Sequence, residues 1–154
     1  MRVKDVMTKS PEVVAPEASL IDAAQTMRSL DVGVVPVCES DRLVGVVTDR
    51  DIVVRAAAEG KDPTKCLVAD AMSAGVSYCF EDDDLVHATR IMEDKQVRRL
   101  PVLNQKKRLV GIVSLGDLAV SGDANLAGEV LKTVSQSTTR GDQSILLGPA
   151  QSRS

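Results

Sequence analysis

The sequence predicts an α+β protein made of two similar strand–helix–strand–strand–helix units. The first observation is a repeat, because residues 43–52 (LVGVVTDRDI) return 66 residues later as residues 109–118 (LVGIVSLGDL). The second is that short β-branched runs alternate with segments whose apolar residues recur at helical spacing. Two copies are too few for a solenoid, so we interpret the pattern as an internal duplication with pseudo-two-fold packing.

The repeat extends to the start of each copy. Residues 3–8 (VKDVMT) correspond to residues 68–73 (VADAMS), a shift of 65. We therefore expect a first repeat over 1–66, a second over 67–121, a C-terminal helix over 122–136 and a mobile tail over 137–154 that is rich in Ser, Thr, Gly and Gln. Each half is short, and so we expect the two halves to share a core.

The elements of the first repeat follow from local signals. Ser19 precedes apolar residues at 20, 23, 24, 27 and 30, which predicts a capped helix over 19–30. The apolar runs 34–38 and 43–47 flank a polar turn and predict a β-hairpin. A helix over 49–58 should end at Gly60, and residues 13–15 predict a short strand. In the second repeat the same pattern predicts elements at 77–80, 84–95, 99–103, 109–113 and 115–121.

Composition limits the class of partner. The 154 residues are 44% hydrophobic, carry a formal charge of −3, and include one Tyr, one Phe and no Trp. This balance argues against a nucleic-acid partner, although Arg98 and Arg99 with the basic run 106–108 would support single-stranded nucleic acid as a third hypothesis. No apolar run reaches membrane length and no signal-peptide core is present, so we expect a cytoplasmic protein with no membrane partner.

The cysteines and the histidine do not predict a metal site. Cys38, Cys66 and Cys79 are odd in number and form no C-x-x-C pair, which is typical of reduced thiols. His87 falls on a predicted helix without clustered ligands. We therefore expect no metal site.

The end of each repeat carries residues that could bind a ligand. A strand that runs into a helix start directs free backbone N–H groups and the positive end of the helix dipole at one point. Thr48 and Ser114 add a hydroxyl, and Arg50 adds a positive charge in the first copy. Asp51 and Asp117 would repel a phosphate but can accept hydrogen bonds from ribose hydroxyls. Phosphate and ribose together indicate a nucleotide.

A structural explanation fits the same residues equally well. Thr48-x-x-Asp51 and Ser114-x-x-Asp117 match the capping box [ST]-x-x-[DE], which needs no ligand and stabilises a helix by about 1 kcal/mol. The two interpretations are compatible, because a capped helix start is still a binding platform. The residues alone leave both open.

The duplicated motifs resemble a tandem pair of cystathionine-β-synthase (CBS) domains, the Bateman module. The resemblance lies in Val-x-Asp-[Val/Ala]-Met-[Thr/Ser], in the Pro-Val before each hairpin and in Leu-Val-Gly-[Val/Ile]-Val-[Thr/Ser]-x-x-Asp, and it covers residues 1 to about 121. It implies two βαββα units packed through their sheets, with two adenosine-ligand sites in a cleft. Asp51 and Asp117 would contact ribose, and Thr48 and Ser114 would contact ribose or phosphate.

The resemblance implies further contacts. Residues before the hairpin proline would line the base or reach the phosphates, and the first strand would contact adenine. These positions are Val34 and Val35 in the first copy, Arg98, Arg99 and Leu100 in the second, and Ser10 and Val13 on the first strand. Because Leu115-Gly116 replaces Asp49-Arg50, the second motif lacks its own cation, and we expect ligand at Thr48 and Asp51 first.

The resemblance suggests a regulatory sensor and not an enzyme, since no P-loop, nucleophile elbow or catalytic set is present. It implies AMP, ADP, ATP or a related adenosyl compound as a regulatory ligand, no obligatory cofactor, and a homodimer that forms a disc of four CBS units. The alternative is a protein-interaction or thiol-redox stress module without a nucleotide, in which Cys38 is a reactive thiol.

Overall fold

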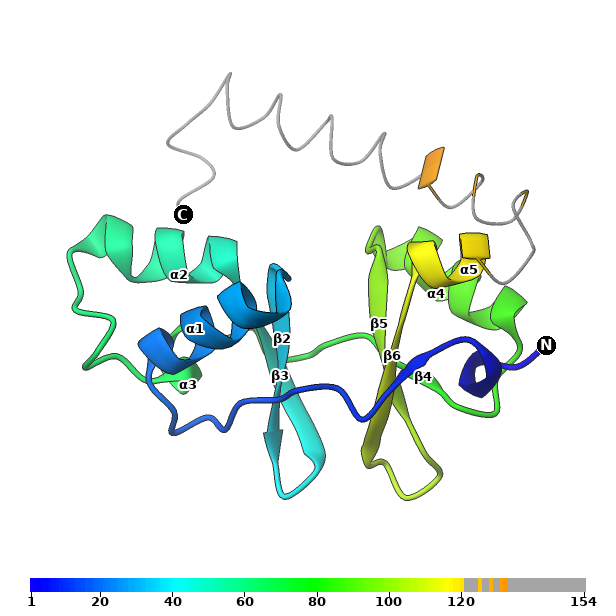
Figure 1. Cartoon of the computed structure of the whole chain (residues 1–154), viewed down its shortest axis with the longest axis horizontal. Helices are drawn as coiled ribbons and strands as arrows, with labels where there is room; N and C mark the ends of the chain where they lie inside the picture. The colour runs from blue at the N-terminus through cyan, green and yellow to red at the C-terminus, as the bar shows by residue number, and fades with distance from the viewer. Residues whose placement is uncertain (121–124, 126–127, 129–130, 133–154) are drawn as a thin grey trace. The chain divides into compact units, whose positions relative to one another are not determined.

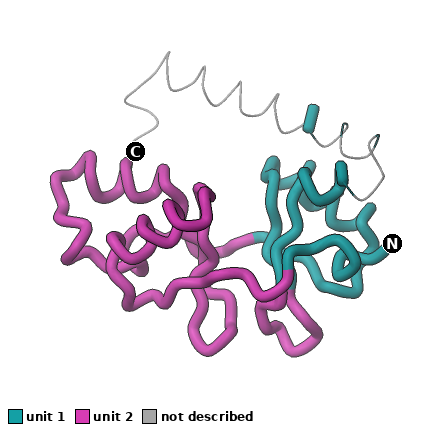
Figure 2. The backbone as a smooth tube through the Cα atoms, in the orientation of Figure 1, with its two compact units in different colours: residues 1–8, 77–102, 111–154 teal, residues 9–76, 103–110 magenta. Residues whose placement is uncertain are grey.

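The α+β class and the two repeats are confirmed. The computed structural model describes residues 1–120 together with Asn125, Gly128, Leu131 and Lys132. These residues form two compact units (Figure 2). Unit 2 consists of Lys9–Val76 and Leu103–Val110, and unit 1 consists of Met1–Thr8, Ser77–Val102 and the described residues from Gly111 onward.

Unit 2 contains most of the first repeat (Figure 1). Its elements are α1 (Leu20–Leu30), β2 (Val34–Glu39), β3 (Arg42–Thr48), α2 (Asp49–Arg55), the 3-10 turn η2 (Ala57–Glu59) and α3 (Val68–Ala71). The helix predicted over 49–58 is divided, since α2 ends at Arg55 and η2 follows before Gly60 closes the segment in the left-handed conformation. The strand predicted over 13–15 is reduced to one bridge between Val14 and Val37, and Pro16, which has no N–H, limits its extension.

Unit 1 carries most of the second repeat together with the opening segment of the first repeat. Its elements are η1 (Val3–Asp5), β1 (Thr8–Lys9), β4 (Cys79–Phe80), α4 (Leu85–Lys95), β5 (Arg99–Leu103), β6 (Leu109–Ser114) and α5 (Leu115–Val120). The strands follow the order β1-β6-β5-β4, and β1, β5 and β6 each reach into the part of the chain assigned to unit 2.

Part of the predicted C-terminal region falls outside the described residues. Of the helix predicted over 122–136, the described residues Asn125, Gly128, Leu131 and Lys132 are helical. Its other residues and the tail predicted over 137–154 lie outside the described part of the chain. Among the described residues, no helix is both long and apolar enough to cross a membrane.

The two equivalent long helices, α1 and α4, end in the same way. Ser19 caps α1 by accepting a hydrogen bond from the Asp22 N–H at 3.2 Å. The helix ends where Asp31 adopts the left-handed conformation with φ 54°, and α4 ends at the equivalent Gln96 with φ 57°. Left-handed residues are the usual way to satisfy the last carbonyls of a helix. The ends of α1 and α4 are therefore encoded locally.

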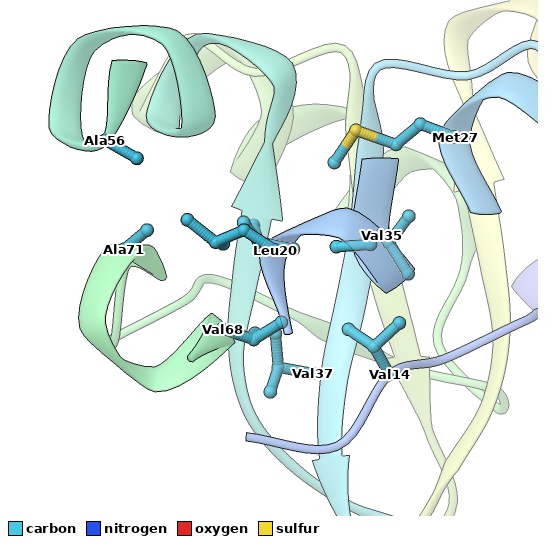
Figure 3. Close-up of a cluster of buried hydrophobic side chains, with 10 residues drawn as sticks. Val14, Leu20, Met27, Val35, Val37, Ala56, Val68 and Ala71 are labelled. Atoms are coloured by element: carbon cyan, nitrogen blue, oxygen red, sulfur yellow. The ribbon is translucent and has the colours of Figure 1, made fainter. Parts of the chain in front are cut away.

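The core of unit 2 joins side chains from both repeats. Leu20, Val35 and Val37 are at most 1% exposed, and Val68 of α3 is fully buried with them. Figure 3 shows Val68 beside Leu20 and Val37. Because Val68 belongs by sequence to the second repeat, unit 2 is completed by a segment from the other copy.

Unit 1 is completed in the same way, so the two repeats exchange their opening segments, residues 1–8 and 68–73. The opening segment of each repeat forms main-chain hydrogen bonds with the residues that precede the long helix of the other repeat. In unit 1 these bonds are Val3 N–H to Asp83 O (2.9 Å) and Lys4 N–H to Glu81 O (3.0 Å), and in unit 2 they are Val68 N–H to Ala18 O (2.7 Å) and Ala69 N–H to Pro16 O (2.9 Å). The four positions of one set lie 65 residues from those of the other. The compact units are therefore divided differently from the sequence repeats at 1–66 and 67–121.

The glycine of each repeated motif lies under an exchanged segment. In unit 2, Val46 and Ser73 exchange two main-chain hydrogen bonds of 3.0 and 2.8 Å. A Cβ on Gly45 would lie 2.7 Å from the Ser73 carbonyl oxygen, and one on Gly111 would lie 2.8 Å from that of Thr8. Each glycine therefore permits close approach of main chain.

Replacing either glycine by alanine should destabilise the protein. We expect Gly45→Ala and Gly111→Ala each to lower the free energy of unfolding by about 1–3 kcal/mol. The new methyl group would meet a backbone oxygen, which cannot move away without disrupting the contacts of the exchanged segment with the strand. Urea unfolding followed by circular dichroism measures this. Gly116→Ala is the matched control, since its nearest neighbour would be the Ser114 Oγ at 3.5 Å. Equal stability of all three variants would contradict this explanation of the motif.

Candidate functional site

The turn at the end of β3 contains a complete capping box. The Asp51 N–H donates to the Thr48 Oγ1 at 3.0 Å, and the Thr48 N–H donates to the Asp51 Oδ2 at 2.9 Å. Both side chains are partly buried. The capping-box interpretation of this motif is thus confirmed, and it fixes the orientation of the hydroxyl and the carboxylate.

The turn at the end of β6 repeats this arrangement. The Asp117 N–H donates to the Ser114 Oγ at 3.2 Å, and the Ser114 N–H donates to the Asp117 Oδ2 at 2.8 Å. In each turn the capping box engages the hydroxyl oxygen as an acceptor and one carboxylate oxygen. The hydroxyl hydrogen and the second carboxylate oxygen, Oδ1, take no part in the capping box.

Each turn is held against the start of the preceding strand. Val34 lies opposite Thr48 in the antiparallel pair of β2 and β3. The Asp49 N–H donates to the Gly33 carbonyl oxygen at 2.9 Å, and the Leu115 N–H donates to that of Arg98 at 3.0 Å. The structure therefore brings Val34 to the first turn and Arg98 to the second.

Some predicted ligand residues are part of the core. Val35 is 1% exposed and Leu100 is fully buried, and these two residues occupy equivalent positions in β2 and β5. Their side chains face the interior, and a contact of these two residues with a ligand stays a prediction. In contrast, Arg98 and Arg99 are exposed.

The first-strand candidates lie beside β6 and β2. The Ser10 N–H donates to the Val110 carbonyl oxygen at 3.2 Å. Val13 is 41% exposed and precedes Val14, whose bridge to Val37 lies on the edge of β2 opposite β3. A contribution of Ser10 and Val13 to a ligand site stays a prediction.

Arg55 is a charged neighbour of the first turn that the motif comparison missed. Its Nε lies 3.9 Å from the Asp51 Oδ1, and its guanidinium donates to the carbonyl oxygens of Ala71 (3.0 Å) and Met72 (3.2 Å). The spacing of an acid four residues before a base on a helix is a sequence signal for such a pair. The second repeat has Ser121 at the equivalent position.

The two turns differ in their charged surroundings. Around the first, Asp49 and Asp51 accompany Arg50 and Arg55, and the exposed Arg50 is the predicted cation. Next to the second, Asp117 is accompanied by the exposed Arg98 and Arg99 at the start of β5. The second motif lacks a cation of its own, and the cations at the start of the preceding strand, β5, are Arg98 and Arg99.

The candidate thiol is buried. Burial raises the pKa of Cys38 to about 11, and the negative charge of Asp41 adds to this effect. Burial likewise raises the pKa of Cys79 to about 12, with a contribution from Asp83. Since the thiolate is the reactive form, these environments oppose the reactive-thiol hypothesis.

Acidic, thiol and imidazole groups do not form a metal cluster in the described part of the chain, where no group of three or more is placed to hold a metal ion. His87 Nε2 lies 3.8 Å from the Asp83 Oδ2 on α4, and its side chain is 58% exposed. This is a surface pair.

Comparison with known proteins identifies the family. Residues 3–57 and 68–121 each match the model of the CBS domain. The chain is 40% identical over 134 residues to the CBS domain-containing protein YhcV of Bacillus subtilis, covering 86% of this chain and 94% of that protein. It is 38% identical over 117 residues to Hypoxic response protein 1 of Mycobacterium tuberculosis, covering 75% and 81%.

Solved structures show the same fold. A crystal structure of Hypoxic Response Protein I with two coordinated zinc ions matches with a TM-score of 0.71 at 38% identity, over 77% of this chain and 97% of that one. CBSX2 of Arabidopsis thaliana in complex with AMP matches with a TM-score of 0.68 at 29% identity, over 78% and 94%. The CBS domain pair of protein MJ0100, in complex with 5′-methylthioadenosine and S-adenosyl-L-methionine, matches with a TM-score of 0.69 at 25% identity, over 81% and 98%.

Relatives that carry an enzyme's name match over a small part of their length. The chain covers 21% of an inosine-5′-monophosphate dehydrogenase of Methanocaldococcus jannaschii and 20% of a homoserine O-acetyltransferase of Methanosarcina acetivorans. These matches indicate no catalytic family for this chain. With two matching domains, relatives of similar length and the shared fold, the chain belongs to the CBS domain family.

Proposed function

We propose that this protein is a regulatory module that binds an adenosine nucleotide, with AMP, ADP, ATP or a related adenosyl compound as its ligand. The main support for this proposal is that both turns hold a hydroxyl and a carboxylate in the same arrangement. In each turn, one carboxylate oxygen lies outside the capping box. The AMP complex of CBSX2 and the adenosyl complex of the MJ0100 domain pair support this choice of ligand.

The residues of each turn have separate roles in the proposal. The Oδ1 atoms of Asp51 and Asp117 accept hydrogen bonds from ribose hydroxyls, and the hydroxyls of Thr48 and Ser114 donate to ribose or phosphate oxygens. Cationic side chains strengthen the binding of phosphate groups through charge-assisted hydrogen bonds. Arg50 supplies one at the first turn, and Arg98 and Arg99, both exposed, supply them at the second.

Regulation requires unequal affinity for two states. A ligand that binds both states of the protein equally changes nothing, however tightly it binds. We propose that the nucleotide favours one arrangement of a CBS dimer, and that this arrangement is the signal to a partner. The role needs no catalytic step.

Nucleotide binding is the first test. A panel of AMP, ADP, ATP, 5′-methylthioadenosine and S-adenosyl-L-methionine is titrated calorimetrically into protein freed of copurified ligand. We expect at least one to bind, and to stabilise the fold by about 2.7 kcal/mol at about 100 times its Kd. Asp51→Asn and Asp117→Asn should each reduce binding at its own turn, since the amide oxygen preserves the cap but an NH2 donor replaces the oxygen that accepts from ribose.

Asp22→Asn is the matched control for these variants. Asp22 is an exposed carboxylate in the first turn of α1, and its substitution should leave the affinity unchanged. The proposal fails if none of the five compounds binds the stripped protein. It also fails if Asp51→Asn and Asp117→Asn both bind as the parent does.

We also propose that the protein acts as a homodimer of four CBS domains. Apolar side chains remain exposed on the helices of both units, including Leu30 of α1 (46%) and Val53 of α2 (59%). In sedimentation equilibrium we expect twice the 16.4 kDa chain mass, and the monomer mass for a Leu30→Lys/Val53→Lys variant. Gln25→Lys, on the exposed part of α1, is the control. A monomeric wild type would contradict the dimer.

Thiol reactivity tests the rival function. At about pH 8 the buried Cys38 and Cys79 should remain protonated and resist iodoacetamide, while the partly exposed Cys66 is modified. Because burial raises both pKa values, alkylation of Cys38 should accelerate only as the pH approaches about 11. Peptide mass mapping measures each site. Rapid modification of Cys38 at about pH 8 would instead favour the thiol-redox module.

A further inference from the structure

Arg55 connects two parts of unit 2 that are far apart in the sequence. On one side its Nε lies 3.9 Å from the Asp51 Oδ1, the carboxylate oxygen outside the capping box. On the other side its guanidinium donates to the carbonyl oxygens of Ala71 and Met72, at 3.0 and 3.2 Å. One side chain therefore contacts both the candidate ligand turn and the end of α3.

Arg55 contacts α3 at its C-terminus, within the segment that the second repeat contributes to unit 2. Met72 is the C-cap of α3, so Arg55 satisfies carbonyls at a helix C-terminus, where a positive charge is favourable. The segment 68–73 is also the one that the second repeat contributes to unit 2, through Val68 to Ala18 and Ser73 to Val46. Arg55 therefore binds the end of α3 within the exchanged segment 68–73.

We propose that Arg55 is a positioning residue that latches α3 to the Asp51 turn and transmits ligand binding at that turn to the exchanged segment. The transmission rests on the proposed function, whereas the latch itself does not. A ligand that carries phosphate adds negative charge near the Arg55 guanidinium, whose side chain is about half exposed (49%). This charge stabilises the conformation in which Arg55 contacts both the Asp51 turn and α3. The second repeat has Ser121 at this position and so lacks the arginine that forms this contact.

The ion pair by itself contributes little, because exposed pairs are weak. The two hydrogen bonds from the Arg55 guanidinium to the carbonyl oxygens of Ala71 and Met72 hold α3, and the Asp51 carboxylate connects Arg55 to the candidate ligand turn. By linkage, a ligand that tightens α3 must bind less tightly when the latch is removed. If removal of Arg55 abolishes the stabilisation of α3 by the ligand, it must therefore also raise the Kd of the ligand.

Hydrogen exchange measured by mass spectrometry on the full chain tests the latch without ligand. In Arg55→Met, exchange in 68–73 should accelerate between about twofold and tenfold for each hydrogen bond lost. Exchange in the equivalent segment 3–8 of unit 1 should not change. Arg55→Lys, which keeps the charge but not the planar fork, should give an intermediate acceleration. Unchanged exchange in 68–73 of Arg55→Met would overturn the latch.

The same measurement with AMP tests the transmission. In the wild type, saturating AMP should slow exchange in 68–73 more than in 3–8. In Arg55→Met this difference should disappear while AMP still binds, with a higher Kd. If AMP binds the wild type and exchange in 68–73 does not respond, the transmission is wrong and the proposed function stands. If no adenosine compound binds, the proposed function and the transmission both fail, and the ligand-free comparison still decides the latch.

Discussion

The reciprocal exchange of opening segments is the constraint on which the rest of the structure depends. Residues 1–8 complete unit 1 and residues 68–73 complete unit 2, so each unit buries apolar side chains that come from both repeats. The exchange also brings main chain onto Gly45 of β3 and Gly111 of β6. Since these strands lead directly into the Thr48 and Ser114 turns, the segments that complete the core also support the candidate sites.

Structure and function are not competing explanations of the turns. The capping boxes use one oxygen of Asp51 and of Asp117 to begin a helix, and this same bond orients the remaining oxygen. A binding group that is held by a local structural bond needs little reordering when a ligand arrives. The charged neighbours then distinguish the turns, with Arg50 and Arg55 at the first and Arg98 and Arg99 at the second.

The sequence was sufficient where the signals were local. The caps of α1 and of both turns, the hairpin of β2 and β3, and the repeat itself could be predicted, because each depends on a few neighbouring residues. The burial of Val35 and Leu100 could not be predicted from alternation, because β2 and β5 are buried along most of their length. The exchange and the Arg55 contacts with α3 join residues far apart in the chain, which periodicity cannot detect.

Two fragments test the exchange most directly. Residues 9–76 include α3 and follow the continuous part of unit 2, whereas residues 1–66 follow the first sequence repeat and lack it. If the exchanged segment completes the unit, the fragment 9–76 should give dispersed amide signals in NMR spectra and a cooperative thermal transition, and the fragment 1–66 should give neither. A fragment 1–66 that folds as well as 9–76 would contradict the account.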